Sequence, residues 1–324
     1  PTPTDGLMAQ ATLLLPVRTR LVGQVLPPDI AKALGRADRA EGEAGERAQL
    51  RRQFRLVPDH WPVAALTRQR DARDAAGATW LRADPARVSP DMTGARMLAY
   101  GEALALTDDD TTQLLPALKP LFGDAGMLLD APDPSRWYLR LSLDAKLPAF
   151  APASEVLGDD LFAHLPEGDA GRRWRALLSE AQVLLHNHPW NAQRTAQGKP
   201  PVNSLWFWGG GVLPDAVTTG FRQVKGNDVL LQSLAQVAGV EATHANGEGG
   251  VDALIDLRHL RNLDLLCSDA LRPLLDALRK RELDALNLDF EDGALFSLRR
   301  DQRWRLWRGA LQRLDTARPD HVPA

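Results

Sequence analysis

The chain lacks residues on which several classes of protein depend. Cys267 is the only cysteine among 324 residues, so an intrachain disulfide and a zinc site built from cysteines are excluded. No apolar run approaches the roughly 20 residues of a membrane span, and the start of the chain lacks the basic and apolar regions of a signal peptide. We therefore expect a cytoplasmic protein without a membrane partner, in which Cys267 is a small buried residue.

Motifs for nucleotide binding and for serine hydrolysis are also missing. Gly209-Gly210-Gly211 does not complete the Gly-x-Gly-x-x-Gly pattern, and neither a P-loop nor a Gly-x-Ser-x-Gly elbow occurs. The net charge of −3 gives no overall positive field that would attract nucleic acid. The basic, aromatic segment around Trp304 and Trp307 is compatible with stacking on bases. Its helical spacing instead favours packing of both tryptophans onto the body of the protein, so no nucleic acid partner is expected.

The composition is that of a soluble globular protein, with 44% hydrophobic and 25% charged residues. Strand-like and helix-like patterns alternate, which predicts an α/β or mixed α+β fold in which helices flank a sheet. Strands are predicted at 11–17, 79–85, 127–130, 137–143, 205–208, 286–290 and 294–298, and helices at 27–39, 60–70, 97–121, 172–186, 228–239 and 271–281. Thr107 with the following aspartates is a helix start signal within the predicted helical stretch at 97–121. Residues 41–55 predict either an exposed helix or a mobile connection.

The segment from Val202 to Pro214 is the most distinctive part of the chain. Leu205 to Trp208 predicts a short buried strand, and Gly209, Gly210 and Gly211 follow it directly. Glycines at the end of a strand allow positive φ angles and let backbone N–H groups approach a bound anion. The same pattern is equally typical of a tight turn after a core strand whose tryptophans serve packing. Both interpretations stay open.

The order of motifs between residues 80 and 240 resembles that of a known family. Arg87-Val88 with Gly94-Ala95-Arg96, the strand from Arg136 to Leu141, and Lys225-Gly226 with Gly239-Val240 contribute to the resemblance. Its most specific part is the series His188-Pro189-Trp190-Asn191, Arg194, Gly198-Lys199, Asn203, Gly209-Gly210-Gly211 and Pro214. The chain resembles the RpfE-type regulatory proteins, which are themselves similar to archaeal-type, cofactor-independent phosphoglycerate mutases of the alkaline phosphatase superfamily.

This resemblance implies a division of the chain into three segments. Residues 1–78 would form the N-terminal part of a reduced alkaline-phosphatase-like core, and residues 216–324 would complete that core. Residues 79–215 would form a region like the inserted domain of the mutases.

The resemblance also implies two metal ions held by Asp and His, together with a serine or threonine nucleophile. The sequence departs from this pattern, because no Asp-Gly follows the first predicted strand and Asp5-Gly6 precedes it. Asp59-His60 comes too early in the chain, and Asp320-His321 lies in the terminal segment. His186 and His188 are compatible with metal binding, with a loop hydrogen bond or with an anion contact. We therefore expect no cofactor, and a divalent metal only if the chain is an enzyme.

A small anion is the ligand that the remaining motifs suggest. The candidate ligand-binding residues are Arg136, Arg140, His188, Asn191, Arg194, Lys199, Asn203, Gly209, Gly210 and Gly211, with Arg194 the first choice. Asn191 and Asn203 either orient the ligand or satisfy buried backbone groups. The favoured hypothesis is a regulatory or metabolite-sensing protein that binds a small phosphorylated or carboxylated metabolite and has lost the dinuclear metal centre. The alternative is an active metal-dependent phosphoryl-transfer enzyme. No protein partner is identified.

Overall fold

The computed structural model describes residues 9–91, 94–244 and 252–316. Contacts divide the chain into two compact units: unit 1 combines Pro1–Val57 with Ala216–Ala324, and unit 2 is Pro58–Asp215. Residues 58–78, which the sequence analysis grouped with the N-terminal segment, belong to unit 2 because their helix packs on its sheet. In the described parts of the chain, no helix is long and apolar enough to cross a membrane.

Unit 1 is built on a sheet with the strand order β11-β10-β12-β1-β13-β14-β2. The five strands from β11 to β13 are parallel to their neighbours, and β14 and β2 complete the sheet in antiparallel pairings. The strands are β1 Gln10–Leu15, β2 Asp38–Glu41, β10 Gln223–Lys225, β11 Glu241–Thr243, β12 Ala253–Asp256, β13 Ala285–Phe290 and β14 Ala294–Arg299; β3 Phe54–Val57 and β9 Ala216–Thr219 form a separate pair. The hairpin predicted at 286–290 and 294–298 is therefore confirmed.

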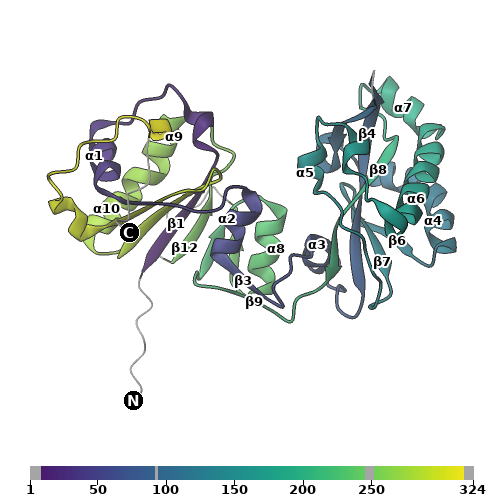
Figure 1. The fold of residues 1–324 in the computed structure, drawn as a ribbon, viewed down its shortest axis with the longest axis horizontal. Helices are drawn as coiled ribbons and strands as arrows, with labels where there is room; N and C mark the ends of the chain where they lie inside the picture. Colours follow the sequence, from purple (N-terminus) through teal and green to yellow (C-terminus); the bar gives the residue numbers. More distant parts are fainter. Residues whose placement is uncertain (1–8, 92–93, 245–251, 317–324) are drawn as a thin grey trace, which may run out of the picture. The chain divides into compact units, whose positions relative to one another are not determined.

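Helices cover both faces of this sheet, which explains why β1 and β12 are almost uniformly apolar. The helical segments of unit 1 are η1 Arg18–Leu21, α1 Pro28–Arg36, α2 Glu46–Gln53, α8 Val229–Val237, α9 Leu263–Leu265, η4 Leu266–Leu271, α10 Arg272–Lys280, η5 Arg300–Trp304 and η6 Leu314–Thr316. Figure 1 shows α1 and α10 on one side of the sheet and α2 and α8 on the other. Residues 41–55 thus contain a helix, α2, whose residues Ala48 to Leu50 are buried.

Unit 2 is an antiparallel sheet with the order β5-β4-β7-β6, to which β8 adds by pairing with β4. Its strands are β4 Thr79–Pro90, β5 Ala95–Tyr100, β6 Leu128–Asp133, β7 Arg136–Leu141 and β8 Ser204–Val212. Its helical segments are α3 Val63–Ala72, η2 Gly101–Leu104, α4 Asp108–Asp124, α5 Ala153–Val156, η3 Leu161–His164, α6 Gly168–His186 and α7 Trp190–Ala196. Helices α4 and α6 lie side by side on one face (Figure 1). The fold of the chain is mixed α/β, as the sequence predicts.

The prediction of helical structure from residue 97 is wrong at its start. Met97 lies in strand β5, which pairs with β4, and the helix begins only at Asp108. The reason is the cap, because Thr107 and Asp110 form a reciprocal capping box that fixes the first turn of α4. Tertiary pairing therefore overrides the helical spacing upstream of the predicted start signal.

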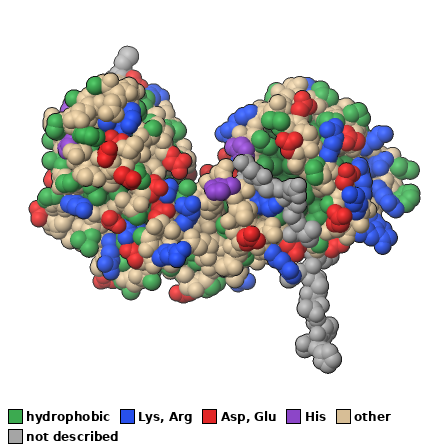
Figure 2. All heavy atoms as spheres, turned by 180° about the vertical axis from the view of Figure 1, so that it is seen from behind, with side chains coloured by type: hydrophobic (Ala, Val, Ile, Leu, Met, Phe, Trp, Pro, Cys, Tyr) green, Lys and Arg blue, Asp and Glu red, His purple; other side chains and the backbone are tan. Residues whose placement is uncertain are grey.

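The two C-terminal tryptophans also differ from expectation. Trp304 and Trp307 are 66% and 79% exposed, so they do not pack onto the body of unit 1 as predicted. The segment is a short 3-10 helix that ends at Trp304, and the helical spacing that would bring both rings to one face does not persist. Elsewhere acidic and basic side chains mix over the visible surface, in keeping with the small net charge (Figure 2).

Candidate functional site

The carboxyl ends of the parallel strands of unit 1 gather ionisable side chains. In open α/β sheets this edge is where ligands usually bind. Strand β12 ends at Asp256, β10 ends at Lys225, and helices α2 and α8 begin beside them with Glu46 and the cap residue Asp228. This edge was not singled out from the sequence, although a carboxylate that ends a buried apolar strand is a readable signal.

Arg258 lies at the centre of this cluster of carboxylates. Its Nε is 2.8 Å from Asp256 Oδ1 and one terminal nitrogen is 2.8 Å from Asp256 Oδ2, a bidentate pair. The other terminal nitrogen is 2.7 Å from Glu46 Oε1, and Asp228 Oδ1 is 3.5 Å from the guanidinium. A Cβ added to Gly226 would lie 2.7 Å from the Cβ of Asp256, so glycine is required for the loop to approach this aspartate.

The electrostatics of this cluster favour the charged guanidinium. Burial opposes ionisation of Arg258, but hydrogen bonds and charge from Asp256, with the charges of Asp228 and Glu46, raise its pKa above the ordinary value. Burial raises the pKa of Glu46, the nearby carboxylates add to the rise, and Arg258 only partly offsets it. Arg258 is thus an internal cation that offsets part of the negative charge of the cluster.

A second set of contacts occupies the adjacent end of β13. Asp289 accepts two hydrogen bonds from Arg52, at 2.9 and 2.7 Å, and a third from Gln53 at 2.8 Å. The buried amide of Gln49 donates to the carbonyls of Asp289 and Leu15 at 2.7 and 3.0 Å. Both contacts tie α2 to the ends of β1 and β13, so Asp289 is engaged within the protein.

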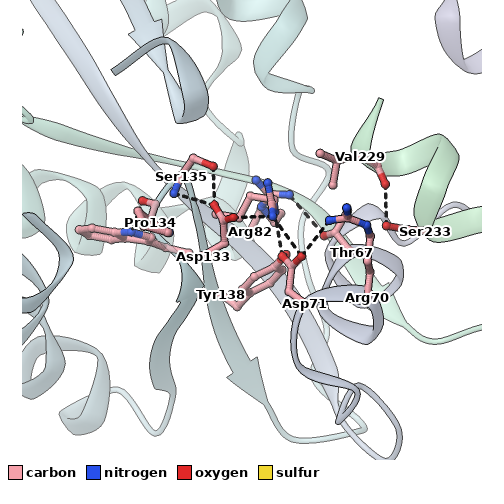
Figure 3. A network of polar contacts seen from close by, with 12 residues as sticks. Thr67, Arg70, Asp71, Arg82, Asp133, Pro134, Ser135, Tyr138, Val229 and Ser233 are labelled. Atoms are coloured by element: carbon pink, nitrogen blue, oxygen red, sulfur yellow. Dashed lines mark hydrogen bonds and ion pairs between the residues drawn. The ribbon is translucent and has the colours of Figure 1, made fainter. Parts of the chain in front are cut away.

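Unit 2 contains a buried polar network on the sheet face that α3 covers. Arg82 donates to Asp84 at 2.8 Å. It also donates to the Thr67 hydroxyl at 3.3 Å, and its guanidinium lies 5.3 Å from the ring centre of Tyr138 (Figure 3). Trp208 donates its indole N–H to Asp84 at 2.7 Å. Burial raises the pKa of Asp84 in spite of these donors.

Arg136, one of the predicted ligand contacts, belongs to the same face. Its Nε donates to Asp71 Oδ2 at 2.7 Å, and its terminal nitrogen donates to Asp133 at 2.7 Å. The Tyr138 hydroxyl also donates to Asp71, at 2.6 Å (Figure 3). Burial opposes ionisation of Asp71, but Arg136 and Tyr138 lower its pKa. These contacts anchor α3 on the sheet, whereas Arg140 on the same strand is exposed.

Arg194, the first choice for anion binding, is 1% exposed. Its guanidinium lies 2.6 Å from Asp110 Oδ2 and donates to the carbonyls of Leu104 and Pro200 at 2.7 and 3.0 Å. Trp190 donates to the other Asp110 oxygen at 2.7 Å. Burial opposes ionisation of Asp110, but the donors Arg194, Trp190 and Thr107 lower its pKa to about 2. The carboxylate that Arg194 binds is therefore supplied by helix α4.

The two predicted asparagines bind backbone groups. Asn191 donates to the carbonyls of Leu185 and Val202 at 2.7 and 2.8 Å and accepts from the Val202 N–H at 2.8 Å. Asn203 exchanges two hydrogen bonds with the backbone of Val88, at 2.8 and 2.7 Å. The sequence left open whether these asparagines orient a ligand or satisfy buried backbone groups. In the structure, both bind backbone groups.

The predicted glycines form part of strand β8 and lie against the start of α3. Gly209 and Gly211 have φ angles of +67° and +149°. A Cβ at Gly209 would lie 2.9 Å from Val63 Cβ, and a Cβ at Gly211 would lie 2.8 Å from Pro62 Cβ. Gly210 faces the side chains of Leu147 and Leu81. The strand does not end at Trp208, and its glycines allow close packing on both faces.

The remaining predicted residues lie at or near the surface. His186 is exposed, and His188 and Lys199 are half-buried. The Nδ1 of His188 accepts a hydrogen bond from the Trp190 N–H at 3.3 Å, which is a loop contact. His60 bonds the carbonyls of Val212 and Pro58.

The residues that the structure describes contain no group of three or more His, Cys, Asp or Glu side chains arranged to hold a metal ion. Asp5-Gly6 and Asp320-His321 lie outside the described residues.

Comparisons with known proteins give a partial match. No protein-family model matches the chain. It is 27% identical over 150 residues to the 2,3-bisphosphoglycerate-independent phosphoglycerate mutase of Methanosarcina mazei, a match that covers 44% of this chain and 34% of that protein. It is 38% identical over 63 residues to a probable mutase of the same kind from Geobacter sulfurreducens, covering 19% of this chain and 16% of that protein. The match therefore spans about a third or less of the length of these relatives.

Two solved structures align over 90% of the chain. One is the cofactor-independent phosphoglycerate mutase of Thermoplasma acidophilum, with a TM-score of 0.44, 15% identity and 89% of that chain covered. The other is a protein of Pyrococcus horikoshii, with a TM-score of 0.45, 11% identity and 88% covered. The sequence matches show that part of this chain is homologous to cofactor-independent phosphoglycerate mutases.

Proposed function

We propose that this chain is an RpfE-like regulatory or metabolite-sensing protein that binds a small phosphorylated or carboxylated metabolite and does not catalyse the mutase reaction. The observation that carries the proposal is Arg258 among the carboxylates of Glu46, Asp228 and Asp256. The guanidinium occupies the space between these carboxylates, at the edge of the sheet where an α/β enzyme would bind its ligand.

The donor set does not fit the two metal ions that the mutase resemblance implies. A divalent cation needs carboxylate or imidazole donors with free lone pairs directed at one point. Both oxygens of Asp256 are engaged by Arg258, and both oxygens of Asp289 are engaged by Arg52. We therefore derive no catalytic step through a metal. A serine or threonine hydroxyl is a weak nucleophile without such activation.

What this arrangement supports is recognition. Paired guanidinium and carboxylate groups fix the side chains at the carboxyl edge of unit 1. Within unit 2, buried ion pairs join α3 to β7 and α7 to α4. A scaffold of this kind offers fixed surfaces for a ligand or a partner. Sensing then requires only that ligand binding shift the stability or the conformation of the chain.

The proposal is tested by metal analysis of the purified protein and by a mutase assay with 3-phosphoglycerate and added Mn²⁺ or Co²⁺. We expect substoichiometric metal and no 2-phosphoglycerate, while a phosphorylated or carboxylated metabolite raises the melting temperature. Arg258→Lys is the matched variant: it keeps the positive charge, loses the bidentate contact and stays inactive. Metal-dependent turnover by the wild-type protein at two bound ions per chain would establish the alternative, an active phosphoryl-transfer enzyme.

A further inference from the structure

Unit 1 contains a cavity of about 360 Å³ between α1, α10, β14 and η5. Its apolar lining consists of Ala33 on α1, Leu275 and Leu278 on α10, and Leu298 on β14. This volume lies at the lower end of the roughly 300 to 1,000 Å³ that small-molecule sites occupy. None of these residues belongs to the carboxyl edge that holds Arg258.

The rim of this cavity is strongly basic. Six cationic side chains line it: Lys32, Arg36, Arg279, Arg299, Arg300 and Arg303. The acidic residue in its lining is Asp29, which pairs with Arg272 at 3.3 Å. Within residues 9–91, 94–244 and 252–316, no carboxylate lies within ion-pair distance of Lys32, Arg300 or Arg303, unlike the arginines of unit 2 described above.

A neighbouring cavity of about 340 Å³ shares three of these arginines, Arg299, Arg300 and Arg303. It adds two acidic residues, Asp284 and Asp301, and Trp304, whose ring centre lies 4.8 Å from the Arg303 guanidinium. The shared arginines thus line both the cavity with the leucines of α10 and the cavity that contains the exposed indole of Trp304. Arg299 is paired with Asp38 at 2.7 Å.

The surface beside these cavities is unusually apolar. Trp304, Leu306 and Trp307 are 66%, 72% and 79% exposed. Figure 2 shows Lys and Arg side chains gathered with hydrophobic ones at the right-hand edge of the view. Large apolar side chains beside an unbalanced positive charge are typical of a binding surface rather than of a solvated face.

We propose that this cavity binds a small organic anion with an apolar body. The phosphate or carboxylate group lies against Arg300 and Arg303, whose guanidinium groups form paired hydrogen bonds to its oxygens, while Arg299 stays paired with Asp38 at the edge of the site. The apolar body enters the pocket lined by Leu275 and Leu278. This inference rests on the ligand-binding part of the proposed function and is independent of the loss of catalysis.

The basic rim and the apolar lining of the cavity together predict a preference for a ligand that has both an anionic group and an apolar body. Octyl phosphate satisfies both the rim and the floor, whereas inorganic phosphate satisfies only the rim and octanol only the floor. Burial of apolar surface and charge-assisted hydrogen bonds add to each other only for the first ligand. We expect octyl phosphate to bind at least 10-fold more tightly than either of the others, with an affinity that falls as salt is added.

The experiment is isothermal titration of the full chain with octyl phosphate, below its critical micelle concentration, with inorganic phosphate and octanol as comparison ligands. The double variant Arg300→Gln, Arg303→Gln should weaken octyl phosphate binding about 10-fold or more, since it removes charge-assisted hydrogen bonds. The control Arg172→Gln changes an exposed arginine of unit 2 and should leave binding unchanged. Circular dichroism and melting curves verify that the variants fold.

Equal affinity of the double variant and the wild-type protein would overturn the inference, as would octanol binding as tightly as octyl phosphate. Absence of octyl phosphate binding at millimolar concentration would also overturn it. None of these results affects the proposal that the chain is non-catalytic. Conversely, turnover of 3-phosphoglycerate would overturn that proposal and leave the anion pocket in place.

Discussion

Replacing Arg258 with alanine should leave three carboxylates without the cation that offsets part of their charge, so that a metal ion can take its place. The substitution leaves Glu46, Asp228 and Asp256 facing the space that the guanidinium fills in the wild-type protein. Three carboxylates that converge without a counterion repel one another, and carboxylate oxygens are the ligands that Ca²⁺ and Mn²⁺ prefer. The variant should therefore lose stability in the absence of cations and regain part of it in their presence.

The magnitude follows from the exposure of the partners. Removal of one partner of a buried ion pair costs about 3–5 kcal/mol. The side chains of Arg258 and Asp256 are 10% and 8% exposed, but Glu46 is 49% exposed and is screened by solvent. We expect a loss of about 3 kcal/mol, near the lower limit of that range. For a domain of this size the melting temperature should fall by roughly 6–12 °C.

The assay is thermal unfolding with and without Ca²⁺ or Mn²⁺. A cation at 100 times its dissociation constant returns about 2.7 kcal/mol to the variant, whereas the wild-type melting temperature should not change. Arg272→Ala is the matched control, because Arg272 and its partner Asp29 are both about half exposed, at 47% and 46%. It should cost less than about 1 kcal/mol and give no cation response.

Two results would refute this reasoning. If Arg258→Ala is as stable as the wild-type protein, the carboxylates do not depend on the guanidinium. If cations stabilise the wild-type protein as much as the variant, they bind elsewhere and Arg258 does not occupy a cation site.

Three further predictions concern stability and reactivity. Asp110→Asn should cost about 2–3 kcal/mol near pH 7, because burial opposes ionisation but hydrogen bonds to the carboxylate lower the folded pKa from 3.8 to about 2. A carboxyl group with a lowered folded pKa stabilises the protein above its unfolded pKa. The difference from the wild-type protein should therefore shrink as the pH falls from about 5 to 2 in urea titrations. The exposed control Asp109→Asn should cost less than about 1 kcal/mol at pH 7. Gly209→Ala should destabilise the protein by roughly 1–3 kcal/mol, because Gly209 has a positive φ angle and lies close to Val63. The control is Gly123→Ala in α4, where the added Cβ would meet no atom within 4 Å. It should be neutral or stabilising in the same denaturant assay. Burial raises the pKa of the Cys267 thiol to about 11, so a disulfide reagent at pH 8 should label it only as fast as the chain unfolds, and rapid labelling without denaturant would contradict its burial.

The elements that the sequence predicts best are those whose signals are local. Thr107 begins α4 because its hydroxyl and the carboxylate of Asp110 satisfy backbone groups three residues apart. The hairpin of β13 and β14 is equally local, with Gly293 at a φ of +88° in its turn. Strand β5 could not be predicted in this way, since the apolar spacing around Met97 is helical and only pairing with β4 makes it a strand.

The candidate site depends on partners that are distant in sequence. Arg194 and Asp110 come from α7 and α4, and Arg258, Glu46 and Asp228 come from three separate segments. A single sequence identifies each as a charged residue without showing which of them meet. The motif that resembles the mutases gave the correct relatives, yet its arginine and two asparagines bind groups of the chain itself.

The difference between a structural and a ligand-binding arginine is whether the chain supplies its carboxylate. Arg194 and Arg136 carry the motif, but Asp110 and Asp71 already fill their hydrogen-bonding positions. Within the described residues, no carboxylate lies within ion-pair distance of Arg300 or Arg303. Both line a cavity with an apolar floor and a second one in which Asp284, Asp301 and Trp304 take part. A buried arginine that is already paired gains little electrostatic energy from a further anion, whereas arginines without a carboxylate partner gain more. We therefore expect the anion site of this protein at the η5 end of unit 1.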